Sequence, residues 1–211
     1  MCSSDLDDPL MQFVDLRDIA IARATRITPP AWMHTLIESD QAPLMLAGGL
    51  AKGRDFARAI GSPELVVCDE GHAVGRRMRD YGGFGDPASP KNALLVECGQ
   101  HWQRSSVDVA DRTLRRFLDR LGMVTADRGA TDAEPPPQRV IEVTHAITIA
   151  SDRFRFLGDY KGLEVIPTAG TEIARDGDRV VRTPYDSCVL IMPTRRVIAG
   201  QTAVRLGRDV A

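Results

Sequence analysis

The sequence lacks the features of a membrane-spanning or a disulfide-stabilised protein. No apolar run approaches the roughly 18 residues that a helix needs to cross a bilayer, and the acidic start MCSSDLDDPLMQF has no apolar core like that of a signal peptide. The four cysteines, at positions 2, 68, 98 and 188, are widely scattered and form no CxxC pair. This spacing predicts reduced thiols in a cytoplasmic protein and disfavours a cysteine-based zinc site.

Signatures of nucleotide and nucleic-acid binding are also missing. The stretch GGFGDP lacks the flanking strand and helix of a dinucleotide fingerprint, and neither a Walker motif nor a G-x-S-x-G elbow occurs. The formal net charge is −2, and basic clusters such as GRRMRDY and RRFLDRL are interleaved with acidic and apolar residues. We therefore expect neither nucleic acid nor a membrane surface as a partner, and the sequence leaves a homo-oligomer open.

A change in sequence pattern divides the chain. Residues 125–139, TADRGATDAEPPPQR, are polar, lack periodicity and contain three consecutive prolines, which favour an extended spacer. We predict an irregular N-terminal segment at 1–30, an α/β domain at 31–124, a proline-rich linker at 125–139 and a β-rich domain at 140–211. The total of 211 residues is sufficient for one or two domains with good cores.

The part before the prolines alternates strand-like and helix-like segments, which predicts an α/β architecture. ELVVCD (64–69) and NALLVEC (92–98) are short, continuously apolar runs, typical of strands buried on both faces in a mostly parallel sheet. Helices are predicted at 49–61 and 106–121. The second is expected to begin at a Ser105 or Ser106 cap, to end at Gly122 and to bury Val107, Ala110, Leu114, Phe117, Leu118 and Leu121.

After residue 140 the pattern changes to short strands. RVIEVTHAITIA alternates apolar and polar residues, and turn signals such as ARDGDR and TPYD separate the runs that follow. No helix is predicted in this part. The pattern indicates a small all-β domain, either a sandwich or a partial barrel.

Glu97 is the first candidate for a catalytic residue. It follows the apolar run Leu94–Val96, and the polar stretch CGQH comes directly after it. At the carboxyl end of a buried strand such a side chain faces the crevice where α/β folds bind ligands, and there it can serve as general base and then general acid. The same residue also suits a simpler role, as a cap of the next segment or as the partner of an arginine.

Three histidines are further candidates. His72 and His101 each follow a predicted strand end, as Glu97 does, which suggests one shared pocket. His34 lies shortly before an apolar stretch, and a lone histidine is more often structural than a metal ligand. His145 lies inside the alternating β run and is expected to be structural.

Three arginines and a cysteine lie near these positions. Arg76, Arg77 and Arg79 could present a guanidinium fork to a carboxylate substrate, or could simply form an exposed helix face. Cys98 is disfavoured as a nucleophile because the neighbouring carboxylate of Glu97 would raise its pKa and oppose formation of the thiolate.

Together these segments resemble a known family. LLVECGQHW, preceded by VVCDEGHAVGRRMRDYGGFGDP and followed by GTEIARDGDRVVRTPYDSCVLIMP and GQTAVRLG, is similar to the succinylglutamate desuccinylase/aspartoacylase family over roughly residues 32–208. The resemblance implies a zinc-carboxypeptidase-like mixed sheet with helices, followed by a small all-β domain. It also implies a zinc-dependent deacylase acting on an N-acyl amino acid or a similar small carboxylate-bearing amide.

The resemblance assigns roles to individual residues. Glu97 corresponds to the family's general base and acid, and WMHTL resembles the segment of the third zinc ligand, which would make His34 that ligand, although Trp32 stands where an acidic residue is usual. Three protein ligands would leave the fourth position of Zn²⁺ for water. Arg79 is the candidate for holding the substrate's carboxylate, and His72 and His101 are candidates for further substrate contacts.

The sequence also departs from the family. In the family, the first two zinc ligands come from an H-x-x-E motif. This motif is absent from the present sequence, in which the only histidine before residue 70 is His34. We therefore expect the chain to correspond to the C-terminal part of such an enzyme with an incomplete zinc site. The alternative function is a metal-free, non-catalytic binding or regulatory module that keeps the fold.

Overall fold

The structure, a computed structural model, describes residues 14–15, 31–36, 42–70, 78–100, 102–124 and 137–210. It divides into two compact units. Residues 1–35 and 43–140 form the first, and residues 36–42 and 141–211 form the second. Most of the predicted N-terminal segment and residues 125–136 of the predicted linker lie outside the described residues, so these two ranges stay predictions.

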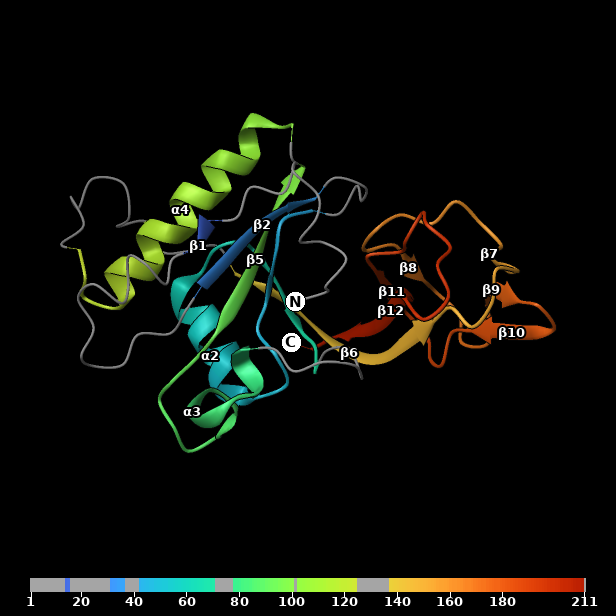
Figure 1. The fold of residues 1–211 in the computed structure, drawn as a ribbon, viewed down its shortest axis with the longest axis horizontal. Helices are drawn as coiled ribbons and strands as arrows, with labels where there is room; N and C mark the ends of the chain where they lie inside the picture. Colours follow the sequence, from blue (N-terminus) through green and yellow to red (C-terminus); the bar gives the residue numbers. More distant parts are fainter. Residues whose placement is uncertain are drawn as a thin grey trace. The chain divides into compact units, whose positions relative to one another are not determined.

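The first unit is a mixed sheet with helices, which confirms the predicted fold class. Its strands lie in the order β1-β2-β5-β3-β4, with β3 parallel to β4 and antiparallel to β5. The helices α2 and α4 pack against each other and contact β4 and β5 respectively (Figure 1). In chain order the elements are β1 (Val14–Asp15), β2 (Ala31–Leu36), β3 (Leu44–Leu46), α2 (Ala51–Ile60), β4 (Leu65–Cys68), the 3₁₀-helix η1 (Met78–Asp80), α3 (Gly82–Gly85), β5 (Leu94–Gln100) and α4 (Arg104–Arg120).

The core of the first unit is built by the continuous apolar runs of its strands. Leu44, Met45, Val66 and Val96 are all at most 1% exposed, as expected for strands covered on both faces. Helix α2 ends at Gly61, which adopts the left-handed conformation (φ 65°) and donates its N–H to the carbonyl of Ala57. The helices meet through aromatic rings: those of Phe56 and Phe117 contact edge to face at 5.8 Å.

The buried face of α4 includes Phe117, as predicted, but differs from the prediction at its first turns. Val107 is 66% exposed, whereas Ser106 and Thr113 are buried. The Ser106 hydroxyl donates to the carbonyl of Gln100, and the Thr113 hydroxyl pairs with that of Ser62. Because these two hydroxyls are satisfied inside the unit, the helix can turn Ser106 and Thr113 inward, which the spacing of apolar residues does not predict.

The start of α4 also differs. Its N-cap is Gln103, which makes no side-chain capping bond, so neither Ser105 nor Ser106 caps the helix. Ser106 lies inside the first turn, where its hydroxyl binds the preceding strand end rather than the amides of its own helix. The prediction of a serine cap was therefore wrong, because a tertiary acceptor competes for that hydroxyl.

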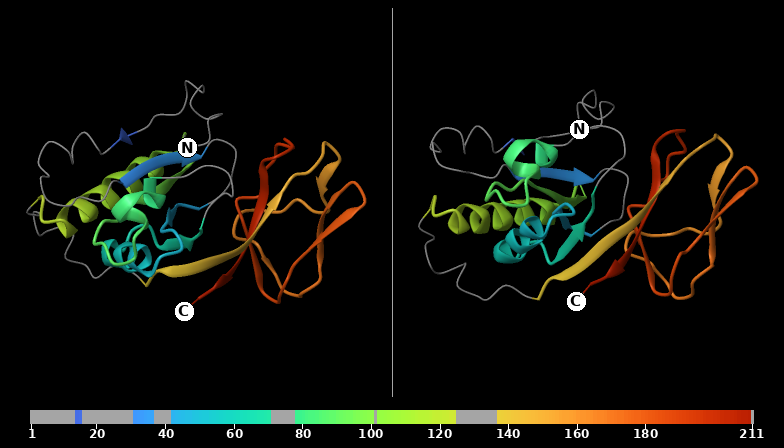
Figure 2. Two further views of the ribbon diagram at one scale, coloured as in Figure 1. Left: turned by 60° about the horizontal axis from the view of Figure 1, so that its bottom comes forward. Right: turned by 90° about the horizontal axis from the view of Figure 1, so that it is seen from below.

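The second unit is built from antiparallel strands. Four of its strands lie in the order β6-β12-β11-β8, and the other three form a sheet of the order β10-β9-β7. Residues 137–210 contain no helix, as predicted (Figure 2). Its core includes Ile173, Leu190 and Val204, none of them exposed. The strands are β6 (Arg139–Thr148), β7 (Phe154–Phe156), β8 (Val165–Ile166), β9 (Glu172–Asp176), β10 (Arg179–Arg182), β11 (Cys188–Ile191) and β12 (Thr202–Asp209).

Across the described part of the chain, no helix combines the length and the apolarity that a membrane crossing requires.

Candidate active site

Glu97 lies within β5 rather than at its tip. It is the fourth of the seven residues of the strand, its Cα partner on β3 is Leu44, and it is 7% exposed. The strand extends to Gln100, which is equally buried, so the polar residues after Val96 do not end the strand as predicted. Burial rather than local polarity sets the length of β5, and it places a carboxyl group inside the first unit.

The carboxyl end of β5 is held close to α4. The carbonyl of Gln100 accepts bonds from the Ser106 hydroxyl at 2.6 Å and from the N–H of Gln103 at 3.1 Å. Gly99, at φ 109°, permits this approach, because a Cβ there would lie 3.1 Å from the Ser106 oxygen. The turn into α4 is therefore tight, and it fixes the strand that carries Glu97.

The strand of His34 lies next to the strand of Glu97. His34 is in β2, which neighbours β5 in the sheet (Figure 1). His72 and His101 lie outside the described residues, so their placement stays a prediction. Of the sequence-predicted site residues, His34 and Glu97 are the pair that the structure brings onto adjacent strands.

Arg79 lies in a different part of the first unit. It belongs to η1, its Nη2 donates to the carbonyl of Asp69 at 2.5 Å, and its Cδ lies against Gly48, where a Cβ would come within 3.2 Å. Gly48 has φ 76°, a conformation that favours glycine. The arginine therefore sits at the carboxyl ends of β3 and β4.

A cavity of about 330 Å³ opens at this end of the strands. Charged and polar side chains on its wall are those of Lys52, Glu70, Arg79, Asp80 and Asn92. Of these, the sequence singled out only Arg79. The rest of the wall is made by Ala47, Gly48, Gly49, Leu50, Gly53, Phe84, Gly85 and Ala93.

The antiparallel direction of β5 separates this cavity from Glu97. Glu97 pairs with Leu44 at the start of β3, whereas Arg79 contacts Gly48 beyond its end. The expected shared pocket of Glu97, His72 and His101 stays a prediction, because both histidines lie outside the described residues.

Cys98 is not suited to nucleophilic catalysis, as the sequence predicted. Burial, and to a lesser extent the neighbouring carboxylate of Glu97, raise the pKa of its thiol from 9.0 to about 12. The neutral thiol is thus favoured in the folded chain. Its contribution to stability is fully present below pH 9.0 and is lost as the pH rises towards about 12.

This raised pKa predicts a pattern of cysteine alkylation. At pH 8, iodoacetamide should label the half-buried Cys68 well before the buried Cys98, because the thiolate is the reactive form. In denaturant both should react at similar rates. Peptide mass spectrometry over a time course measures the labelling. If Cys98 in the folded chain reacts as fast as it does in denaturant, the raised pKa of its thiol is contradicted.

The side chains that the structure describes do not form a metal site by themselves. Among residues 42–70, 78–100, 102–124 and 137–210, no group of three histidine, cysteine, aspartate or glutamate side chains is arranged to hold a metal ion. These side chains alone do not provide the ligands for the zinc ion that the family resemblance implies. A zinc ion would need ligands from beyond these ranges.

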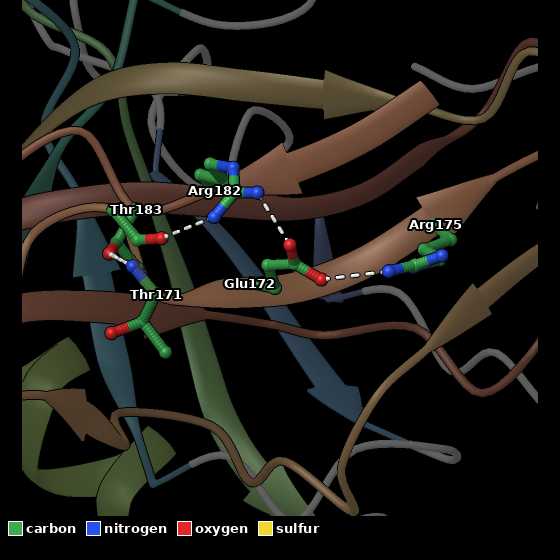
Figure 3. Close-up of polar contacts among 6 residues, drawn as sticks. Thr171, Glu172, Arg175, Arg182 and Thr183 are labelled. Atoms are coloured by element: carbon green, nitrogen blue, oxygen red, sulfur yellow. Dashed lines mark hydrogen bonds and ion pairs between the residues drawn. The ribbon is translucent and has the colours of Figure 1, made fainter. Parts of the chain in front are cut away.

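A charged cluster in the second unit has a structural explanation. The carboxylate of Glu172 on β9 lies between the guanidinium groups of Arg175 and Arg182 (Figure 3). These two arginines lower the pKa of Glu172, with the hydrogen bond from Arg175 as the largest cause. Arg182 also donates to the carbonyl of Gly170, so the cluster joins β9 to β10 at the surface.

No protein-family model and no curated protein matches this chain. Several solved structures are similar to it. Succinylglutamate desuccinylase from Vibrio parahaemolyticus is 20% identical with a TM-score of 0.58, and the match covers 93% of this chain and 58% of that one. The desuccinylase from Vibrio cholerae is 18% identical with a TM-score of 0.60, covering 85% and 53%.

A third structure, a succinylglutamate desuccinylase/aspartoacylase from Rhodobacter sphaeroides, is 15% identical with a TM-score of 0.56, covering 93% of this chain and 62% of that one. This chain therefore has the fold of the succinylglutamate desuccinylase/aspartoacylase proteins, which confirms for the fold the resemblance seen in the sequence. It spans between 53% and 62% of the length of these three proteins.

Proposed function

We propose that this chain acts in the hydrolysis of an N-acyl amino acid or a similar small carboxylate-bearing amide, with Glu97 moving the protons. The observation that carries the proposal is a buried carboxyl group on β5, beside the strand of His34, in a fold shared with desuccinylases. Amide hydrolysis needs a group that accepts a proton from the attacking water and later donates one to the leaving amine. A glutamate carboxyl group can do both.

Burial explains why this position suits the chemistry. A carboxylate that is 7% exposed meets few competing water molecules, so its interaction with a reacting group is less screened than at the surface. The tight turn at Gly99 and the bond from Ser106 to Gln100 fix the strand, which limits how far the carboxyl group can move.

Zinc and His34 belong to the same proposal. We propose that the reaction uses Zn²⁺ with His34 as one ligand, the remaining ligands coming from outside the described residues. Zinc would polarise the scissile carbonyl and supply a water molecule of lowered pKa. Arg79, His72 and His101 are proposed to contact the substrate.

Zinc content tests this part of the proposal. The untagged chain, purified and equilibrated with zinc, is expected to retain bound metal by mass spectrometry of the metal. His34→Ala should remove most of it. The matched control is His145→Ala, which alters an exposed histidine that contacts Thr144 in the second unit. Equal zinc in wild type and His34→Ala would rule out the ligand assignment.

The second candidate function is a metal-free binding or regulatory module. It is favoured by the absence of an H-x-x-E motif from the sequence. It predicts that the wild-type chain retains no zinc and hydrolyses no amide, while remaining folded.

A further inference from the structure

Lys52 makes an unusual set of contacts. It is in the first turn of α2, and its side-chain nitrogen Nζ lies within hydrogen-bonding distance of four backbone carbonyl oxygens of the segment that follows η1. The distances are 2.9 Å to Gly83, 2.6 Å to Asp86, 3.1 Å to Ser89 and 2.8 Å to Lys91. Figure 1 shows α3 beside α2, where these contacts form.

The sequence of the segment explains why these carbonyls need a partner. Pro87 and Pro90 have no backbone N–H, so the segment has fewer donors than acceptors. Two of its other amides donate to side chains instead: Ala88 to the carboxylate of Asp86 and Lys91 to the hydroxyl of Ser89. The surplus carbonyl oxygens turn to the ammonium group.

The four carbonyl oxygens surround the ammonium group as ligands surround a cation, rather than pairing one to one with its N–H groups. We call these four oxygens the cradle. An ammonium group has three N–H donors, and here it faces four acceptors. Convergent carbonyl dipoles stabilise a compact positive charge in the same way that carbonyl rings hold K⁺ in channels.

The choice of lysine at this position supports this interpretation. The chain contains three lysines, Lys52, Lys91 and Lys161, against 24 arginines. A planar guanidinium cannot present a compact charge to four oxygens at once, whereas an ammonium can. In a chain that otherwise favours arginine, the position facing the cradle carries lysine.

We propose that the segment Gly83–Lys91 is a binding site for a monovalent cation of ammonium size, which this chain fills with its own Lys52. The occupied cradle holds in place the part of the cavity wall that Phe84, Gly85 and Asn92 form. Lys52 is thus a positioning residue for that cavity. With the side chain removed, K⁺, NH₄⁺ or methylammonium should take its place.

Hydrogen exchange of the full chain tests the proposal. For Lys52→Ala in lithium chloride, amides of residues 82–93 should exchange about tenfold faster than in wild type. Potassium or methylammonium chloride at the same ionic strength should restore the wild-type rate. Wild type should exchange alike in all three salts, and Lys52→Arg should not be restored, because the bulky guanidinium remains in place. Equal rates for Lys52→Ala in lithium and potassium would overturn the cation site.

A second measurement needs no variant. An amine-reactive reagent should modify Lys52 of the native wild-type chain about tenfold more slowly than the exposed Lys91 and Lys161, because the ammonium is engaged by the cradle. The three lysines should react alike once the chain is unfolded in urea. Labelling of native Lys52 at the rate of Lys161 would overturn the proposal even if Lys52→Ala fails to fold.

Discussion

Replacing Glu97 with glutamine is expected to lower amide hydrolysis by about 100-fold or more while leaving the fold intact, since positioned acid–base groups contribute about 10²–10⁴-fold to catalysis. Glutamine has nearly the same shape but can neither accept a proton from water nor donate one to the leaving amine. Initial rates of amino-acid release measure the effect, and circular dichroism checks the fold.

The matched control for this substitution is Glu64→Gln. Glu64 is exposed and lies just before β4 in the same unit, so its neutralisation tests for any general effect of losing one negative charge. We expect its hydrolysis rate to equal that of wild type. A Glu97→Gln chain that remains folded and nearly as active as wild type would remove Glu97 from the mechanism.

Gly53→Ala is expected to destabilise the first unit by about 3 kcal/mol, although alanine normally stabilises a helix by about 1 kcal/mol relative to glycine. Gly53 is buried in α2, and a Cβ there would lie 2.2 Å from the carbonyl oxygen of Ala47. That oxygen cannot move aside easily, because the N–H of the same residue is bonded to Val67 of β4. Because of this clash, alanine is expected to destabilise the folded chain at this position, although it usually stabilises a helix relative to glycine.

Urea unfolding followed by tryptophan fluorescence measures this effect. Both tryptophans, Trp32 and Trp102, belong to the first unit, so the signal reports on that unit. Ala59→Gly, at an exposed position of the same helix, is the control and should cost about 1 kcal/mol from helix propensity alone. Stabilisation by Gly53→Ala would show that α2 does not pack this closely on the end of β3.

Elements with a strong local sequence pattern were predicted correctly. The runs around Val66 and Val96 are strands, and the helices α2 and α4 begin and end within two residues of their predicted bounds. The succession of short runs after residue 140 likewise predicted a β-rich unit. These elements follow from the spacing of apolar residues and turn residues, which the sequence displays directly.

Errors arose where a partner distant in sequence decides the outcome. The inward turn of Ser106 depends on the carbonyl of Gln100, and that of Thr113 on the hydroxyl of Ser62. The antiparallel direction of β5 relative to β3 was likewise not predicted, because no local pattern encodes strand direction. Lys52 was missed for the same reason, because its acceptors lie 31 to 39 residues further along the chain.

The candidate site was predictable in part. The interruption of an apolar run by Glu97 was a local signal, and the structure places that residue in the interior of the first unit. The cavity beside Arg79 was not predicted. Gly48 and Gly49 allow other side chains to approach closely, but in the sequence they look like ordinary turn residues. Its additional wall residues, Glu70, Asp80 and Asn92, are polar residues without a motif.

The most direct test of the proposed function is the rate at which the purified chain, supplied with zinc, releases free amino acid from N-succinyl and N-acetyl amino acids. We predict a rate clearly above that of the Glu97→Gln chain measured alongside. A wild-type rate no greater than that of Glu97→Gln, from a folded chain across the whole substrate panel, would contradict the hydrolase and favour the binding module.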